Sequence, residues 1–92
     1  MLQAFSFIVQ SVEDLWYVFC TPMSSTEDTV VLDLWCPENP IFTSRVSFSK
    51  NDSLMDSVQN YIFHVAQQNQ INLNNLKITQ NTIPPALPSM RV

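Results

Sequence analysis

The chain has no glycine among its 92 residues, where an average composition would supply about six. Its turns must therefore be built by asparagine, aspartate, serine and proline, which tolerate or fix the dihedral angles that turns need. The absence also excludes the glycine-rich loops that cradle phosphates or dinucleotides, and the glycine-flanked nucleophile elbow of hydrolases. The sequence therefore indicates neither a cofactor nor a small-molecule substrate.

Charged residues are scarce as well, at 13% of the chain, which is about half the usual share. Eight carboxylates outweigh four lysines and arginines, giving a formal net charge of −4. Because no basic patch is present to neutralise phosphates, we expect no direct binding of nucleic acid. The hydrophobic fraction of 46% favours a folded core over disorder. It also leaves apolar surface for a partner protein to cover.

Side chains that bind metals or act as nucleophiles are few. His64 is the single histidine, and with Cys20 and Cys36 it supplies too few ligands for a zinc site within one chain. A cysteine-dependent enzyme, with His64 as the base, is the least favoured hypothesis. Two cysteines in apolar surroundings are more typical of buried, reduced thiols in an intracellular protein, cytoplasmic or nuclear. No window supplies the ~20 apolar residues that cross a bilayer, and the N-terminus lacks the positive segment of a secretory signal, so no membrane insertion is expected.

A β-hairpin is the clearest local pattern. Residues 30–36 and 42–48 both alternate apolar and polar side chains, and a proline-containing turn at 37–40 separates them. Only a register that brings the two apolar faces together can bury both. That register predicts the inner pairs Val30–Phe48, Leu32–Val46 and Cys36–Phe42, and an outer face with Asp33 opposite Arg45 and with Trp35.

An amphipathic helix is predicted next, at residues 53–68, where apolar side chains recur at helical spacing. Ser53 is placed to cap its first turn. Asn69 is the expected residue of left-handed conformation that ends it. A short strand at 76–79 then precedes an extended, proline-rich tail at 83–92.

Residues 2–14 fit two interpretations. Phe5, Phe7 and Val9 alternate as in a strand, whereas Phe5, Val9 and Val12 recur at the 4,3 spacing of a helix. We expect an irregular or helical start over 2–14. After it we expect an aromatic, β-branched strand at 15–21 and a polar loop at 22–29.

Together these patterns predict one α+β domain over residues 1–82. Its mainly antiparallel sheet of three to four strands is packed by the helix at 53–68, with a second, N-terminal helix as a possible addition. The order of hairpin, helix and strand over residues 30–79 resembles the start of a β-grasp, ubiquitin-like module. The resemblance implies that topology, carries no family motif and transfers no functional residue. A three-stranded meander flanked by two helices is the rival architecture.

The expected function is protein–protein interaction without catalysis, as an adaptor, an assembly subunit or a homo-oligomer. The candidate binding residues are Trp35, Asp33, Arg45 and Thr43 on the outer sheet face. The edge of the strand over 41–48 could also accept a strand from a partner. Trp35 is either an exposed anchor or covered by the N-terminal segment. A small acidic inhibitor that enters the basic cleft of an enzyme is the alternative function, and residues 85–88 of the tail match a PxxP ligand imperfectly.

Overall fold

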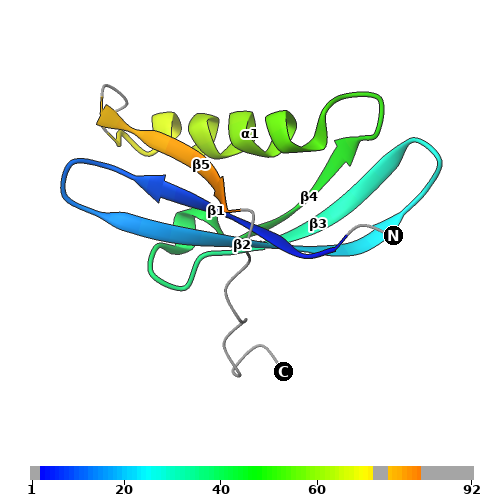
Figure 1. Ribbon diagram of the computed structural model, residues 1–92, viewed down its shortest axis with the longest axis horizontal. Coiled ribbons are helices and arrows are strands. Elements are labelled where there is room, and N and C mark those ends of the chain that lie inside the picture. The colour runs from blue at the N-terminus through cyan, green and yellow to red at the C-terminus, as the bar shows by residue number, and fades with distance from the viewer. Residues whose placement is uncertain (1–2, 72–74, 82–92) are drawn as a thin grey trace.

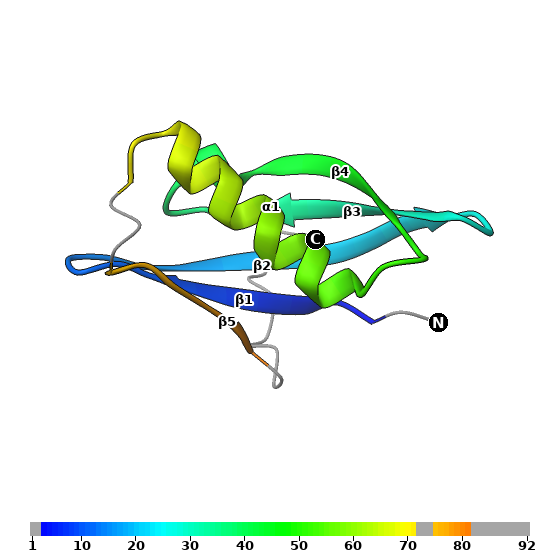
Figure 2. The same ribbon diagram turned by 90° about the horizontal axis from the view of Figure 1, so that it is seen from above.

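The computed structural model describes residues 3–71 and 75–81 of the chain. These residues form a single antiparallel sheet with strand order β4–β3–β2–β1–β5, and one α-helix. The elements are β1 Phe5–Gln10, β2 Leu15–Ser25, β3 Thr29–Trp35, the 3₁₀ turn η1 Pro40–Phe42, β4 Ser44–Ser49, α1 Leu54–Gln68 and β5 Lys77–Asn81. Figures 1 and 2 show α1 lying across one face of the sheet. The predicted α+β class, with one principal helix packed on the sheet, is confirmed.

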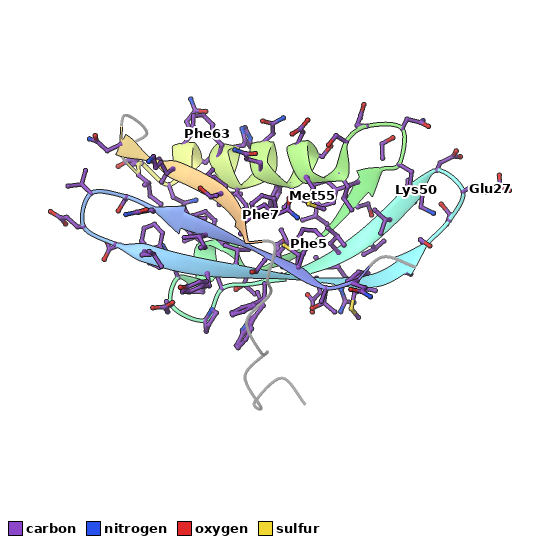
Figure 3. The ribbon with its side chains drawn as sticks, in the orientation of Figure 1. Phe5, Phe7, Glu27, Lys50, Met55 and Phe63 are labelled. Carbon is purple, nitrogen blue, oxygen red and sulfur yellow. The ribbon has the colours of Figure 1, made fainter. Side chains whose placement is uncertain are left out.

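The hydrophobic core lies between α1 and the sheet. Every second residue of the strands faces it, because successive side chains of a strand point to opposite sides. Figure 3 shows Phe5, Phe7 and Met55 between the two layers, whereas Phe63 points away from the sheet. The largest fully buried side chains include Phe7, Val9, Val18, Leu32, Leu34, Phe42, Val58 and Ile62. Burial of one such side chain contributes about 1.5–3 kcal/mol, so this layer is what holds the fold together.

The N-terminal segment is a strand, so the irregular or helical start expected over residues 2–14 is wrong, as is the second helix. β1 is joined to β2 by a turn in which the Ser11 amide donates to the Asp14 carbonyl at 2.8 Å. Val12, which completed the helical spacing, is 70% exposed in that turn. The alternating β1 residues instead enter the core: Phe5, Phe7 and Val9. This extra strand raises the sheet to five, above the three to four expected.

β2 is confirmed where a strand was expected, but it continues into the predicted polar loop at 22–29. The pairing with β3 shifts between Pro22 and Ser24. A bulge of this kind is where a proline is tolerated within a sheet, because one residue there need not donate to the ladder. The turn that follows is closed by the Thr26 hydroxyl, which accepts from the Thr29 amide at 3.1 Å.

The β3–β4 hairpin has the register predicted from its apolar faces. Its pairs include Val30–Phe48, Leu32–Val46 and Asp33–Arg45. The pair expected between Cys36 and Phe42 is not part of the ladder, because Phe42 belongs to η1, which begins at Pro40. The Cys36 amide donates instead to Oγ1 of Thr43 at 3.0 Å. Phe42 is nevertheless buried in the core.

α1 begins where the sequence predicted. The Ser53 hydroxyl accepts from the Asp56 amide at 3.4 Å, and so caps the first turn. The Asp56 carboxylate in that turn also suits the positive end of the helix dipole.

α1 ends at Gln68 as predicted, but the conformation of the residue after it differs from the prediction. Asn69 has φ −100° and is not left-handed; the positive φ, 62°, belongs to Gln70. Asn69 ends the helix through its side chain instead, since its Nδ2 donates to the Val65 carbonyl at 2.8 Å. The left-handed step therefore comes one residue later than expected.

The position of β5 decides the topology. The strand expected at 76–79 is confirmed as β5, but it pairs antiparallel with β1, at the opposite edge of the sheet from β4. The first strand of the hairpin, β3, pairs on its other side with β2, antiparallel, and β5 is separated from the hairpin by both β2 and β1. The ubiquitin-like topology is therefore not confirmed, and the described residues do not form the rival two-helix meander either. The tail expected at 83–92 lies outside the described residues.

Candidate protein-binding surface

The sheet face opposite α1 carries a row of apolar side chains, which we call the outer strip. Its members are Ile8, Tyr17, Phe19 and Trp35. They alternate with the core residues of β1, β2 and β3, so their side chains leave the sheet on the side away from α1. Within residues 3–71 and 75–81, no α-helix or strand lies over this face (Figure 1). An antiparallel sheet with one open face usually presents polar side chains there.

The rings of the outer strip contact one another in sequence across two strands. Tyr17 and Phe19, two residues apart on β2, have ring centroids 6.4 Å apart and nearly parallel planes. Phe19 and Trp35 are direct partners of the β2–β3 ladder, with centroids 5.6 Å apart. Offset ring contacts of this kind add about 0.5–1.5 kcal/mol to the burial of the rings. The three aromatic side chains therefore form one preorganised surface rather than separate residues.

The structure brings three of the four predicted binding residues together. Asp33 and Arg45 are opposite one another in the β3–β4 ladder, and Trp35 is the next residue on the same face of β3. Trp35 is half-buried and packs on Phe19. The N-terminal strand β1 is not the neighbour of Trp35 in the sheet, since β2 separates β1 from β3.

Thr43, the fourth predicted residue, has a structural use. Its exposed side chain accepts a hydrogen bond from the Cys36 amide at 3.0 Å and donates one to the Cys36 carbonyl at 3.4 Å. The hydroxyl therefore closes the connection between β3 and β4.

Sequence reasoning missed Ile8, Tyr17 and Phe19. The aromatic, β-branched run after residue 14 indicated a strand, and its alternation gives the two faces of that strand. What the sequence does not reveal is that β2 lies next to β3, which places Phe19 opposite Trp35. Without that pairing, the aromatic residues of β2 could not be joined to the predicted surface.

One row of the sheet runs from β5 to the outer strip. Asn81 pairs with Ser6, Ser6 with Phe19, and Phe19 with Trp35. Although this row is on the side away from α1, Ser6 is 0% exposed and Phe19 only 6%. The Ser6 hydroxyl is buried without a hydrogen-bond partner among the described residues.

The two cysteines are held in the core. Burial raises the pKa of the Cys20 thiol from its ordinary 9.0 to about 12, and its Sγ donates to the Val18 carbonyl at 3.8 Å. Burial also raises the pKa of Cys36, against a smaller opposing effect of hydrogen bonds from the Asn39 and Glu38 amides. His64 lies on the exposed side of α1. A thiolate nucleophile needs a lowered pKa and access to solvent, and this arrangement offers neither.

An open hollow of about 680 Å³ lies at the end of the sheet where the β1–β2 turn meets η1 and the C-terminal end of α1. It is lined by apolar Val12, Trp16 and Ile41 and by the carboxylates of Glu13 and Asp14. The two carboxylates are the only ionisable groups among its lining residues. The hollow could therefore hold an apolar or a basic group of a partner.

Within the part of the chain that the structure describes, no three histidine, cysteine, aspartate or glutamate side chains are grouped to hold a metal ion. The described helix is too short and too polar to cross a membrane. Comparisons of the chain with protein-family models, with curated proteins and with solved structures found no match.

Proposed function

We propose that this protein is a protein-interaction module that binds its partner through the outer strip and performs no catalysis. The observation that carries the proposal is the ring contact from Tyr17 through Phe19 to Trp35, on the sheet face opposite α1 (Figure 1). Aromatic residues are enriched at the centres of protein interfaces, where they bury large areas at little cost in side-chain entropy.

Polar groups beside the outer strip would give the interface its specificity. Asp33 and Arg45 form a cross-strand pair next to Trp35. Such rim charges steer and orient a partner more than they add affinity. β4 is an edge strand with exposed Arg45 and Ser47, and its free backbone groups could accept a strand from the partner.

The partner is either a second copy of the chain, giving a homodimer or larger assembly, or a different protein. Both fit an intracellular location, where the reducing environment leaves buried thiols such as Cys20 and Cys36 unpaired. The absence of catalysis is supported by the raised thiol pKa values and by the exposed position of His64.

The alternative function, a small acidic inhibitor of an enzyme with a basic cleft, is supported by one observation. Glu13 and Asp14 line the hollow together with Trp16. The two carboxylates and the indole ring would therefore contact the basic cleft of the enzyme together. Binding through this hollow would weaken steeply with salt, because exposed charges are screened. Binding through the outer strip would tolerate salt.

The first test is the solution mass by light scattering at several concentrations, for the wild type, Trp35→Ser and Phe63→Ser. Phe63, 41% exposed on α1 and pointing away from the sheet (Figure 3), is the matched control for losing an apolar surface side chain. If the partner is a second copy, we expect an oligomer that Trp35→Ser dissociates and Phe63→Ser preserves, with both variants folded by circular dichroism.

If the wild type is monomeric, the same three proteins are used as bait, and binding is then measured with the purified partner. The proposal requires affinity to fall at least tenfold for Trp35→Ser and to stay unchanged for Phe63→Ser. Equal affinity for all three proteins would show that the outer strip is not the binding surface.

A further inference from the structure

Two residues of the outer sheet face, Ser6 and Phe19, are buried, although α1 lies on the other side of the sheet. Side chains on a sheet face open to water keep much of their accessible surface, whereas Ser6 and Phe19 have lost nearly all of theirs. The rings of Tyr17 and Trp35 shield part of Phe19. These two rings belong to β2 and β3, whereas Ser6 lies on β1, next to β5. They therefore do not account for the burial of Ser6. A covering layer over this row is therefore needed.

The chain leaves the sheet at the end of this same row. β5 ends at Asn81, which pairs with Ser6, and Trp35 lies three strand spacings away. At about 4.8 Å per strand, that distance is about 14 Å. Six residues in polyproline II conformation span about 19 Å. Residues 83–88, which follow Asn81 almost at once, can therefore cross the row as far as Trp35.

The composition of residues 83–88 matches the surface that they would cross. Ile-Pro-Pro-Ala-Leu-Pro contains no charged and no polar side chain. Proline-rich segments bind grooves lined by aromatic rings, because their preformed conformation loses little entropy on docking. A cover of this kind excludes water and brings no side-chain partner for a hydroxyl, which agrees with the buried, unpartnered Oγ of Ser6.

We propose that residues 83–88 dock in cis across the outer strip, over Ser6, Phe19 and Trp35, and that a partner protein must displace them. The displacement rests on the proposed function, whereas the docking does not. A tether this short gives an effective concentration in the millimolar range, so a segment of the same chain occupies the surface ahead of a second copy. The apparent affinity for the partner is then reduced by the fraction of time that the surface is occupied.

The test uses the full chain labelled with ¹³C and ¹⁵N. The wild type is compared with Pro85→Ser/Leu87→Ser, and with Ser89→Ala as a matched control just outside the segment. In a monomeric sample we expect nuclear Overhauser contacts from Leu87 to the rings of Phe19 and Trp35. The double variant should lose these contacts and shift tryptophan emission to longer wavelength, and Ser89→Ala should keep both signals.

Two results would overturn docking in cis. One is a wild type without contacts to the rings and with fast backbone motion over residues 83–88. The other is contacts that appear only between labelled and unlabelled chains in a mixed sample, which would mean docking on a second copy.

Partner binding separates this inference from the proposed function. If both are correct, the double variant binds the partner, or itself, several-fold more tightly than the wild type. If the contacts are present but Trp35→Ser leaves partner affinity unchanged, the proposed function fails and docking stands. If the contacts are absent but Trp35→Ser still weakens partner binding, docking fails and the proposed function stands.

Discussion

Phe19 and Trp35 are direct partners in the β2–β3 ladder, with ring centroids 5.6 Å apart and ring planes inclined at 33°. The contact follows from the register, because both residues alternate with core positions on their strands. A shift of either strand by one residue would turn its ring toward α1 and its core residues toward water. The same hydrophobic pattern that buries the core therefore fixes the geometry of the outer strip.

The first prediction concerns the coupling of these two rings. In a double-mutant cycle with Phe19→Leu and Trp35→Leu, we expect an interaction energy of about 0.5–1.5 kcal/mol in the free energy of unfolding. Urea denaturation followed by circular dichroism measures it. The control cycle pairs Tyr17→Leu with Trp35→Leu, and should give a value near zero, since Tyr17 packs on Phe19 instead. Equal coupling in both cycles would contradict the ring order described for the strip.

Local patterns predicted the hairpin and the helix well. The β3–β4 register follows from residues 30–48 alone, because only one alignment buries both Val30 and Leu32 against apolar partners. The cap at Ser53 has a local cause too, since a serine before an amphipathic stretch satisfies amides of the first turn. Neither feature depends on distant segments, so the sequence was sufficient.

The rest of the fold is set by contacts between segments far apart in the sequence. Residues 5–10 carry both a helical and a strand pattern, and pairing with β2 and β5 on either side selects the strand. The end of α1 at Gln68 was predicted, but the left-handed conformation belongs to Gln70 and not to Asn69, whose Nδ2 donates to the Val65 carbonyl. The outer strip was found only in part, since Phe19 meets Trp35 through a strand pairing that no local pattern encodes.

The second prediction concerns the buried hydroxyl of Ser6. Ser6→Ala should leave the free energy of unfolding unchanged or raise it by up to about 1 kcal/mol, because it removes a polar group that has no partner among the described residues. The matched control is Thr43→Val, which removes a hydroxyl bonded to the backbone of Cys36 and should cost about 0.5–1.5 kcal/mol. Both values come from urea denaturation. Destabilisation by Ser6→Ala as large as that by Thr43→Val would mean that Ser6 has a partner.

The third prediction concerns Gln70, which follows α1 in a left-handed conformation that glycine would adopt more easily. Gln70 has φ 62°, a conformation that costs a residue with a side chain roughly 1–2 kcal/mol. Gln70→Gly should therefore stabilise the protein, by up to about 1 kcal/mol after the greater flexibility of glycine in the unfolded chain is counted. Asn69→Gly, one residue earlier, has no such strain to relieve and loses the hydrogen bond to Val65, so it should destabilise. Thermal denaturation of the two variants must shift the midpoint in opposite directions; a loss for Gln70→Gly would refute the left-handed assignment.

The last prediction is a loss of stability at alkaline pH caused by Cys20. Burial raises the pKa of this thiol from 9.0 in the unfolded chain to about 12 in the folded protein, so the folded state holds the proton that the unfolded state releases. The stabilisation is complete below pH 9 and is lost as the pH rises toward 12. At pH 10 Cys20 should account for a loss of about 1.4 kcal/mol relative to pH 7. Urea midpoints from pH 7 to 10 for the wild type and Cys20→Ala measure it, because the two proteins differ only at this thiol. The variant should lose less stability than the wild type over this range, and parallel curves would mean that the thiol ionises as readily in the folded protein as in the unfolded chain.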